Sequence, residues 1–369
     1  MKIGILTFHH GINHGGFLQA YALQNTLKEL GYENKIINYR NVGHLCKKYK
    51  LLFFTPRLLN NSKKWLKFRN DHKRLHMSRF ALTVGRVDNE RFDVIILGSD
   101  EIWNFENSMF GFDPIYFGIG LNAKKVIAYA ASFGNVDVNG IIPDKICGAI
   151  NNLQDISVRD ENSQRIVSKI TGKDFPILLD PTFLYDFKGK ERGSPYSDFI
   201  LVYGNIRKRE QIDRILSFAR SQNRKTISVA YKNSWCDINI VSLDAFEWLA
   251  YFKKASMVIT SMFHGTVFSI KYNKPFCIIV TPYRKNKFEP TLRCLGLSSR
   301  VLGDDNPLEE IFNRGIEFDQ VNVKINKMVD ESVRFIEKAI SLDHSFVESE
   351  SAIAPPQPCS RITQAGDCS

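Results

Sequence analysis

The feature that most constrains the fold of this chain is the alternation of short apolar runs, typical of buried strands, with segments of helical periodicity. Residues 2–8, 93–97 and 126–131 are three such runs in the first half of the chain. The alternation stops at a polar stretch, residues 186–197, and resumes beyond it. Strands that alternate with helices predict parallel sheets. The pattern therefore predicts an α/β protein of two Rossmann-like domains.

We expect an N-terminal domain over residues 1–190, interrupted by a basic insertion at 43–91, and a C-terminal domain over residues 191–345. A length of 369 residues suits two domains. The tail at 346–369 is rich in Pro, Ser and Gln and is expected to be disordered. Ligands of parallel α/β sheets bind beyond the carboxyl ends of the strands. Two such domains facing each other would therefore gather these loops around one cleft.

The composition excludes several other classes of protein. Hydrophobic residues make up 44% of the chain, with 27 Phe, which is too many for a wholly disordered protein. No run reaches the roughly 18 apolar residues that a membrane-spanning helix needs. The N-terminus lacks the apolar core of a signal peptide, so we expect a cytoplasmic protein. Seven dispersed Cys without a CxxC pair predict reduced thiols and no structural zinc site.

The formal net charge of +11 is concentrated in one segment. Residues 47–86 contain twelve Lys or Arg and a single acidic residue, Asp71. Apolar and aromatic residues such as Trp65 and Phe68 are interleaved with these cations. Three interpretations are open: a solvated insertion that packs on its own domain, a surface for an anionic membrane, or a nucleic-acid site. No nucleic-acid motif accompanies the segment, so nucleic acid is not expected as a partner.

His264 is the sharpest candidate for chemistry. It follows an apolar run at 257–260 and stands at a strand-to-helix turn. The N–H groups of a helix N-terminus can bind a phosphate or a carboxylate, and a histidine there can act as a general acid or base. The alternative is that His264 only caps the turn through its own hydrogen bonds.

Polar residues also follow the buried run at 93–97. Ser99, Asp100, Trp103 and Asn104 can bind sugar hydroxyls or supply a base. An equally consistent interpretation is a helix-capping loop with Trp103 in the core. Arg159, at the end of another short strand, suits bidentate binding of phosphate or carboxylate, or an ion pair with a neighbouring acid.

The N-terminal loop at residues 9–16 is rich in Gly and contains His9, His10 and His14, and we expect a helix to begin after it at Phe17. No acidic residue or Cys is spaced with these histidines, so no metal site is expected. Its glycines can instead let backbone N–H groups approach an anion or an acceptor. The loop matches neither a P-loop nor a dinucleotide fingerprint.

Seven short motifs occur in an order and spacing that resemble the polysaccharide pyruvyl transferase family over about residues 1–300. They are Asn13-x-Gly15-Gly16-x-Leu18-Gln19, Gly98-Ser99-Asp100-x-x-Trp103-Asn104, Tyr129-Ala130-Ala131-Ser132-Phe133-Gly134, Ser157-Val158-Arg159-Asp160, Leu179-Asp180-Pro181-Thr182, Thr260-Ser261-x-x-His264-Gly265 and Asn273-Lys274-Pro275-Phe276. The resemblance implies a GT-B-like fold. It also implies transfer of a pyruvyl group from phosphoenolpyruvate to hydroxyls of a sugar, in a surface polysaccharide or its lipid-linked precursor, to form a ketal without a further cofactor.

The resemblance also implies roles for particular residues. His264 would be the general acid/base and Arg159 would bind the donor. The family often carries a basic residue just before this His, where the present chain has Met262 and Phe263. Donor binding is therefore expected to draw on four further residues: Ser261, Gly265, Arg284 and Lys287. We expect Asp100 to assist the acceptor hydroxyl and Trp103 to stack on the sugar. Six more residues are expected to contact the acceptor: Asn13, Gly15, Gly16, Gln19, Ser99 and Asn104.

Two other functions remain open at this stage. One is a GT-B glycosyltransferase that uses a nucleotide sugar, with the same fold and cleft but a different donor. The other is a non-catalytic module that binds an acidic glycan. If the acceptor is lipid-linked, the basic insertion would hold the enzyme peripherally at the inner face of the plasma membrane.

Overall fold

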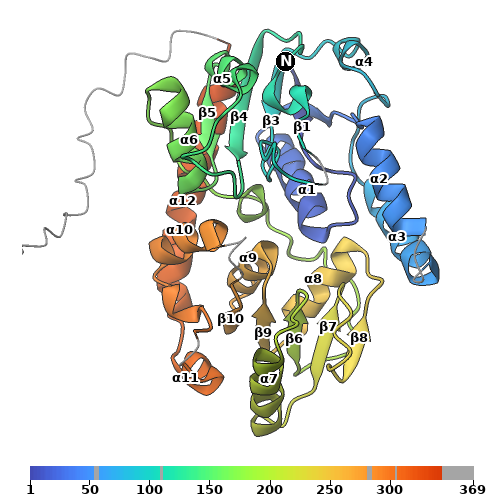
Figure 1. Ribbon diagram of the computed structural model, residues 1–369, viewed down its shortest axis with the longest axis vertical. Coiled ribbons are helices and arrows are strands. Elements are labelled where there is room, and N and C mark those ends of the chain that lie inside the picture. Colours follow the sequence, from blue (N-terminus) through green and yellow to red (C-terminus); the bar gives the residue numbers. More distant parts are fainter. Residues whose placement is uncertain (54–57, 109–110, 281–284, 304–305, 343–369) are drawn as a thin grey trace, which may run out of the picture.

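The computed structural model describes residues 1–53, 58–108, 111–280, 285–303 and 306–342, without the side chains of 48–53, 58–60 and 285–287. The chain forms two α/β units, one above the other along the long axis of the molecule (Figure 1). This confirms the predicted fold class. The tail at 346–369 lies outside the described residues. Among the described helices, none is both long enough and apolar enough to cross a membrane.

The N-terminal unit is built on a five-stranded parallel sheet in the order β2-β1-β3-β4-β5. Its strands are β1 (Lys2–Leu6), β2 (Glu33–Ile36), β3 (Val94–Leu97), β4 (Lys125–Ala131) and β5 (Ile156–Val158). Its helical segments are α1 (His14–Glu29), α2 (Val42–Phe53), α3 (Leu58–His72), α4 (Val84–Asp88), η1 (Pro114–Phe117), α5 (Asp144–Asn151), α6 (Glu161–Thr171) and η2 (Pro181–Phe183). β3 is buried along its whole length, as a central strand covered on both faces must be.

The C-terminal unit repeats this plan with the strand order β10-β9-β6-β7-β8, again all parallel. Its strands are β6 (Ile200–Tyr203), β7 (Thr226–Val229), β8 (Ile238–Ile240), β9 (Met257–Thr260) and β10 (Phe276–Ile278). Its helical segments are α7 (Arg209–Ser221), α8 (Ala245–Lys254), α9 (Phe263–Lys271), α10 (Lys285–Leu295), η4 (Ser298–Arg300) and α11 (Leu308–Asn313). α8 begins with a reciprocal capping box between Asp244 and Glu247, as its sequence indicates.

The last helix, α12 (Phe318–Ile340), runs from the C-terminal unit back to the N-terminal sheet (Figure 1). The Leu179 N–H donates to Ser332 Oγ at 3.3 Å, and the rings of Tyr129 and Phe335 lie 6.4 Å apart. A single apolar cluster includes buried residues of both units, such as Leu23 and Trp248. The two sheets therefore share a continuous core, which fixes their relative position.

The basic helix α3 belongs to the N-terminal unit but docks on the C-terminal one. Lys64 Nζ donates to the Ala230 carbonyl at 2.8 Å, and Lys67 pairs with Glu247 at 2.5 Å. Asp71 Oδ2 accepts from the Ala245 N–H at 2.7 Å, at the first residue of α8. Burial raises the pKa of Asp71 to about 7. The insertion thus packs against the opposite unit, rather than on its own domain alone.

Candidate active site

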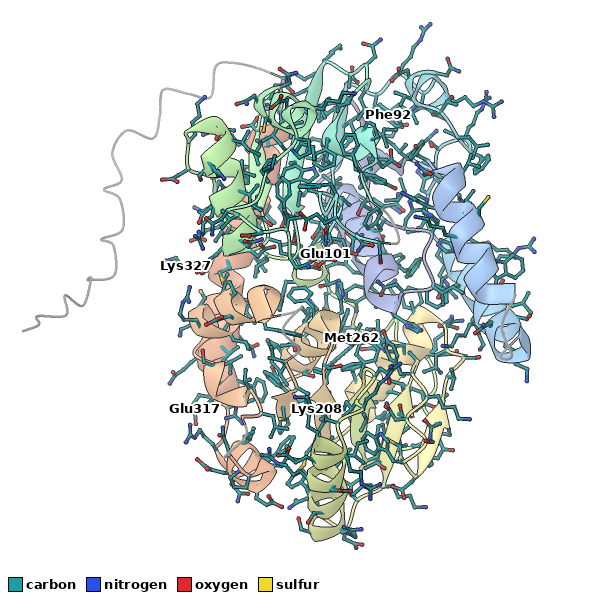
Figure 2. All side chains as sticks on the ribbon, in the orientation of Figure 1. Phe92, Glu101, Lys208, Met262, Glu317 and Lys327 are labelled. Atoms are coloured by element: carbon teal, nitrogen blue, oxygen red, sulfur yellow. The ribbon has the colours of Figure 1, made fainter. Side chains whose placement is uncertain are left out.

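The loops that leave the carboxyl ends of the N-terminal strands face the start of α9 in the C-terminal unit. Glu101, next to Asp100 in the chain, and Met262, two residues before His264, lie on facing sides of this boundary (Figure 2). Because both sheets are parallel, their carboxyl edges are the places where ligand-binding loops collect. The structure brings Asp100, Arg159 and His264 together from three separate elements.

Asp180 connects these three residues into one charged cluster. Its Oδ2 lies 2.9 Å from Arg159 Nη1 and 3.5 Å from His264 Nε2, while Arg159 Nη2 lies 3.5 Å from Asp100 Oδ1. Burial alone would raise the pKa of Asp180, but His264 and Arg159 hold it well below its usual range. Asp180 is therefore an anion at neutral pH, placed to orient the imidazole.

Two nitrogens of the cluster have unmet hydrogen-bonding capacity. Arg159 Nη2 and His264 Nε2 are buried and have no hydrogen-bond partner among the described residues, although each lies 3.5 Å from a carboxylate oxygen. Both residues line a small cavity of about 70 Å³. Buried polar groups are almost always satisfied, so a ligand with acceptor oxygens is the expected partner at this position.

The backbone around Asp100 is held in an unusual conformation. Asp100 has a φ of +82°, in the left-handed region that few non-glycine residues adopt. Ala130 on the neighbouring strand has a φ of +48°, where the pairing of β4 and β5 shifts register between Ala128 and Ala131. Such conformations persist where the surrounding structure imposes them, and they cluster at functional sites. Here they shape the edge of the sheet that carries Asp100 and Arg159.

Gly15 provides the space in which the His264 ring lies. A Cβ atom at Gly15 would lie 2.1 Å from His264 Nδ1, so no other residue fits without moving the imidazole. α1 begins at His14 rather than at Phe17, which corrects the predicted start of this helix. Asn13 precedes it in an extended conformation, so Gly15 and Gly16 fall in the first turn instead of a loop.

Phe263 supports the arginine of the cluster. The Arg159 guanidinium lies 4.8 Å from the centre of the Phe263 ring, within the range of a cation–π interaction. The centre of this ring lies 5.3 Å from that of the His264 imidazole. α9 therefore contributes an aromatic surface, rather than a cation, beside the histidine.

The residues predicted on the acceptor side fall into two groups. Asn13 lines the small cavity, and Ser99 Oγ donates to Asp180 at 3.4 Å, so both belong to the site. Gln19 is buried and donates to Thr7 and to the Gly16 carbonyl, which fixes the N-terminal loop. Asn104 is also buried and donates to Asn135, outside the charged cluster.

Trp103 does not reach the cleft, and its expected stacking on a sugar is wrong. The side chain is fully buried and its Nε1 donates to the Tyr116 carbonyl at 2.9 Å. Its ring packs against Phe117 and Phe133 in the N-terminal core. The alternative interpretation, a core tryptophan beneath the loop, describes the structure.

The residues predicted on the donor side are placed differently. Ser261 is buried next to Gly204, where a Cβ would lie 2.1 Å from Ser261 Oγ. Gly265 allows α9 to pack closely on β9, because a Cβ there would lie 2.1 Å from Thr260 Oγ1. Arg284 and the side chain of Lys287 lie outside the described residues.

A larger cleft of about 660 Å³ adjoins the small cavity and shares Asn13, Tyr203 and Met262 with it. Its lining includes three cations that sequence reasoning missed: Lys64, Arg207 and Lys232. Asp180 was also missed as a site residue. It follows the segment at residues 177–179, which pairs with β5 through Ile177, just as Arg159 follows β5 itself. For Arg207 the available signal was its place in the loop that follows β6, because ligands bind beyond the carboxyl ends of parallel strands. Nothing in the sequence indicates that Lys64 reaches this cleft.

Two of the three histidines of the N-terminal segment, His9 and His14, are buried against backbone carbonyls. Within the described ranges, no group of three or more His, Cys, Asp or Glu is arranged to hold a metal ion. His9 Nδ1 contacts the Thr7 carbonyl at 3.0 Å, and His14 Nε2 contacts the Leu243 carbonyl at 3.1 Å. Burial lowers the pKa of both imidazoles to about 4, so they are neutral at physiological pH.

Two parallel α/β units that face each other across a cleft define a GT-B-type fold. A structure of UDP-GlcNAc 2-epimerase from Methanocaldococcus jannaschii, in complex with UDP-GlcNAc and UDP, is similar at a TM-score of 0.52 and 12% identity, covering 92% of this chain and 100% of the epimerase. The UDP-GlcNAc 2-epimerase from Neisseria meningitidis bound to UDP-GlcNAc has a TM-score of 0.47 and 11% identity, with coverage of 92% and 94%. A comparison with curated proteins gave no match.

The sequence profile of the polysaccharide pyruvyl transferase family matches residues 13–282, well over half of the chain. The matched region contains Asp100, Arg159, Asp180 and His264. The chain therefore belongs to the polysaccharide pyruvyl transferase family, a family of transferases.

Proposed function

We propose that this protein transfers a pyruvyl group from phosphoenolpyruvate to two hydroxyls of a sugar, forming a cyclic ketal in a surface polysaccharide or its lipid-linked precursor. The observation that carries the proposal is the cluster of His264, Asp180 and Arg159, at a cavity between the two units of a chain that belongs to this family. A lipid-linked acceptor would bring the enzyme from the cytoplasm to the inner face of the membrane.

The proposed reaction begins with a proton added to the methylene carbon of the enol phosphate, which leaves positive charge on the adjacent carbon. A sugar hydroxyl attacks that carbon and loses its proton. The C–O bond to phosphate then breaks, and its electron pair leaves with the phosphate. Attack by a second hydroxyl, which also loses its proton, closes the ketal. The products are the pyruvylated sugar and inorganic phosphate, and no oxidant or reductant is consumed.

Three side chains of the cluster suit these steps. His264, oriented by Asp180, can deliver the proton to the methylene carbon and take one back. Asp100, 3.5 Å from Arg159 Nη2, can accept the proton of an acceptor hydroxyl. Arg159 Nη2 can donate to the carboxylate of the donor, which would satisfy that buried nitrogen.

The proposal is tested by a phosphate-release assay on the purified protein, with phosphoenolpyruvate and a panel of galactosides and N-acetylmannosaminides, free and lipid-linked. We expect release that depends on both substrates. His264→Gln should lower the rate about 10²- to 10⁴-fold, the usual contribution of a general acid or base. His76→Gln is the matched control, because His76 lies on the surface away from the cluster.

Binding measurements separate this proposal from a glycosyltransferase. A ligand that binds the native state raises the unfolding temperature. Phosphoenolpyruvate should therefore protect the protein against heat, and UDP-sugars should not. Protection by UDP-sugars alone, together with no phosphate release from any acceptor, would overturn the proposal in favour of a nucleotide-sugar donor.

A further inference from the structure

The small cavity beside His264 has too little positive charge for a donor as anionic as phosphoenolpyruvate. Its Arg159 already faces two carboxylates, Asp180 at 2.9 Å and Asp100 at 3.5 Å. If His264 is protonated as well, its charge and that of Arg159 together only cancel the two negative charges of Asp100 and Asp180. The turn before His264 adds no cation, because Met262 and Phe263 occupy it. Arg159 can hold the donor carboxylate, but the phosphate needs positive charge from elsewhere.

In the adjoining cleft, cationic side chains outnumber acidic ones. Lys64, Arg207 and Lys232 line it, and no Asp or Glu is among its described lining residues. The three cations come from α3, from the loop after β6 and from the loop after β7. They therefore converge on this space from both units. Because the cleft shares Tyr203 and Met262 with the small cavity, one ligand can extend from the cations to His264.

Lys64 reaches from α3 to the opposite unit at the wall of this cleft. Its Nζ donates to the carbonyl of Ala230 at 2.8 Å. Ala230 itself has a φ of +63°, a left-handed conformation that is rare for a residue with a Cβ. A strained residue that presents its carbonyl to a lysine at the wall of a cleft is consistent with a built site.

We infer that Lys64, Arg207 and Lys232 bind the phosphate group of the donor and stabilise it as it leaves. This inference rests on the proposed function and deepens it by naming the donor's phosphate subsite. When the C–O bond breaks, the electron pair passes to the phosphate oxygen, and the negative charge develops beside these cations. Lys64 makes the N-terminal insertion part of the donor site, so donor binding requires both units.

The test compares Lys64→Met with two neighbours on the same helix, in the full-length protein. Methionine removes the charge and keeps most of the apolar stem. Lys63→Met removes an exposed charge that does not line the cleft, and Lys67→Met removes a different link to the C-terminal unit, the pair with Glu247. The second control separates loss of phosphate binding from a general loosening between the units.

Calorimetry measures the affinity for phosphoenolpyruvate and for inorganic phosphate, and kinetics measure KM for the acceptor. We expect Lys64→Met and Lys232→Met to weaken both phosphate ligands about tenfold or more, since hydrogen bonds to charged groups are among the stronger ones. The acceptor KM should stay within about twofold. Both control variants should bind phosphoenolpyruvate as the wild type does.

Two results would overturn the inference while leaving the proposed function intact. One is unchanged affinity for phosphoenolpyruvate and phosphate in Lys64→Met. The other is a rise in the acceptor KM alone, which would assign the cations to a phosphate on the acceptor. If the wild-type protein binds neither phosphoenolpyruvate nor phosphate, the proposed function fails as well, and the two failures are thereby distinguished.

Discussion

The two sheet edges that meet at the cleft differ in how their charges are arranged. At the N-terminal edge Asp100 and Asp180 each pair with Arg159, and Arg159 and Asp180 are almost completely buried. The C-terminal edge contributes one buried imidazole, His264, and two exposed cations, Arg207 and Lys232. One edge is therefore a buried network with one more carboxylate than guanidinium, whereas the other presents exposed positive charge.

This difference separates two tasks that a single active site must perform. Groups that transfer protons need fixed positions, and buried ion pairs fix them at the cost of desolvation. Groups that capture an anionic ligand need charge that solvent and ligand can reach. In this fold the N-terminal edge supplies the positioning and the C-terminal edge, joined by Lys64, supplies the capture.

Breaking the buried network should have the largest effect on stability. Asp180→Asn leaves Arg159 and His264 without their shared anion, and removing one partner of a buried pair costs about 3–5 kcal/mol. The free energy of unfolding, measured in urea, should fall by that amount. Asp213→Asn is the control, because its pair with Arg209 is exposed and such pairs contribute less than about 1 kcal/mol. Equal effects of the two substitutions would contradict the contrast between the network and the surface.

The pH dependence of stability probes the contact between the edges. His14 stacks on Trp248 with ring centres 5.5 Å apart, and burial lowers its pKa from 6.5 to about 4. Between these values the unfolded chain binds more protons than the native state. The stabilisation is therefore complete above pH 6.5 and is lost as the pH falls toward 4.

The lowered pKa of His14 contributes about 3 kcal/mol to the free energy of unfolding above pH 6.5, at 1.36 kcal/mol per pKa unit. Unfolding in urea between pH 4 and 7.5 should show a shallower pH dependence for His14→Gln than for the wild type. His76→Gln is the control, because this histidine is exposed. Identical slopes for His14→Gln and the wild type would show that His14 is not held neutral by the contact.

Gly15 tests whether the two edges must approach this closely. Gly15→Ala places a Cβ within 2.1 Å of His264 Nδ1, and such overpacking costs about 1–3 kcal/mol. Turnover should fall as well, because the imidazole must move away from Asp180. Gly148→Ala, in α5, meets no atom within 4 Å and should be neutral or slightly stabilising. If the Gly15→Ala protein were as stable and as active as the wild type, the close packing of Gly15 against the His264 ring would not be required.

The smallest effect concerns the two faces of α3. One face docks on the C-terminal unit through Lys64 and Lys67, while Lys63, Leu66 and Arg69 are exposed. If the exposed face contacts an anionic membrane, the protein should sediment with anionic vesicles in a salt-sensitive manner. Neutralising both Lys63 and Arg69 should weaken binding several-fold per charge, at about 1 kcal/mol each. Arg209→Gln, on α7, is the control, and equal binding by all proteins would exclude this face as the membrane surface.

Much of the fold was predictable, because strands such as β1, β3 and β9 are continuous apolar runs bounded by Gly or polar residues. The same rule placed Asp100, Arg159 and His264 at strand ends. β8, a short edge strand of three half-buried residues, carries too weak a pattern to be predicted. The partnership of Asp180 with His264, and the reach of Lys64 into the cleft, depend on how the two units pack. No local pattern encodes that packing.

Trp103 was misplaced because a tryptophan in a polar loop can point to either side.

The most direct test of the central claim follows the fate of the donor's atoms. The purified protein is given phosphoenolpyruvate labelled with carbon-13 and an active acceptor in heavy water, and the products are analysed by NMR and mass spectrometry. The account predicts that the label joins the sugar, that its methyl group carries a deuteron from solvent, and that His264→Gln abolishes both. Labelled pyruvate free in solution, with the phosphate on the sugar, would contradict the account, because P–O rather than C–O cleavage would then be the reaction.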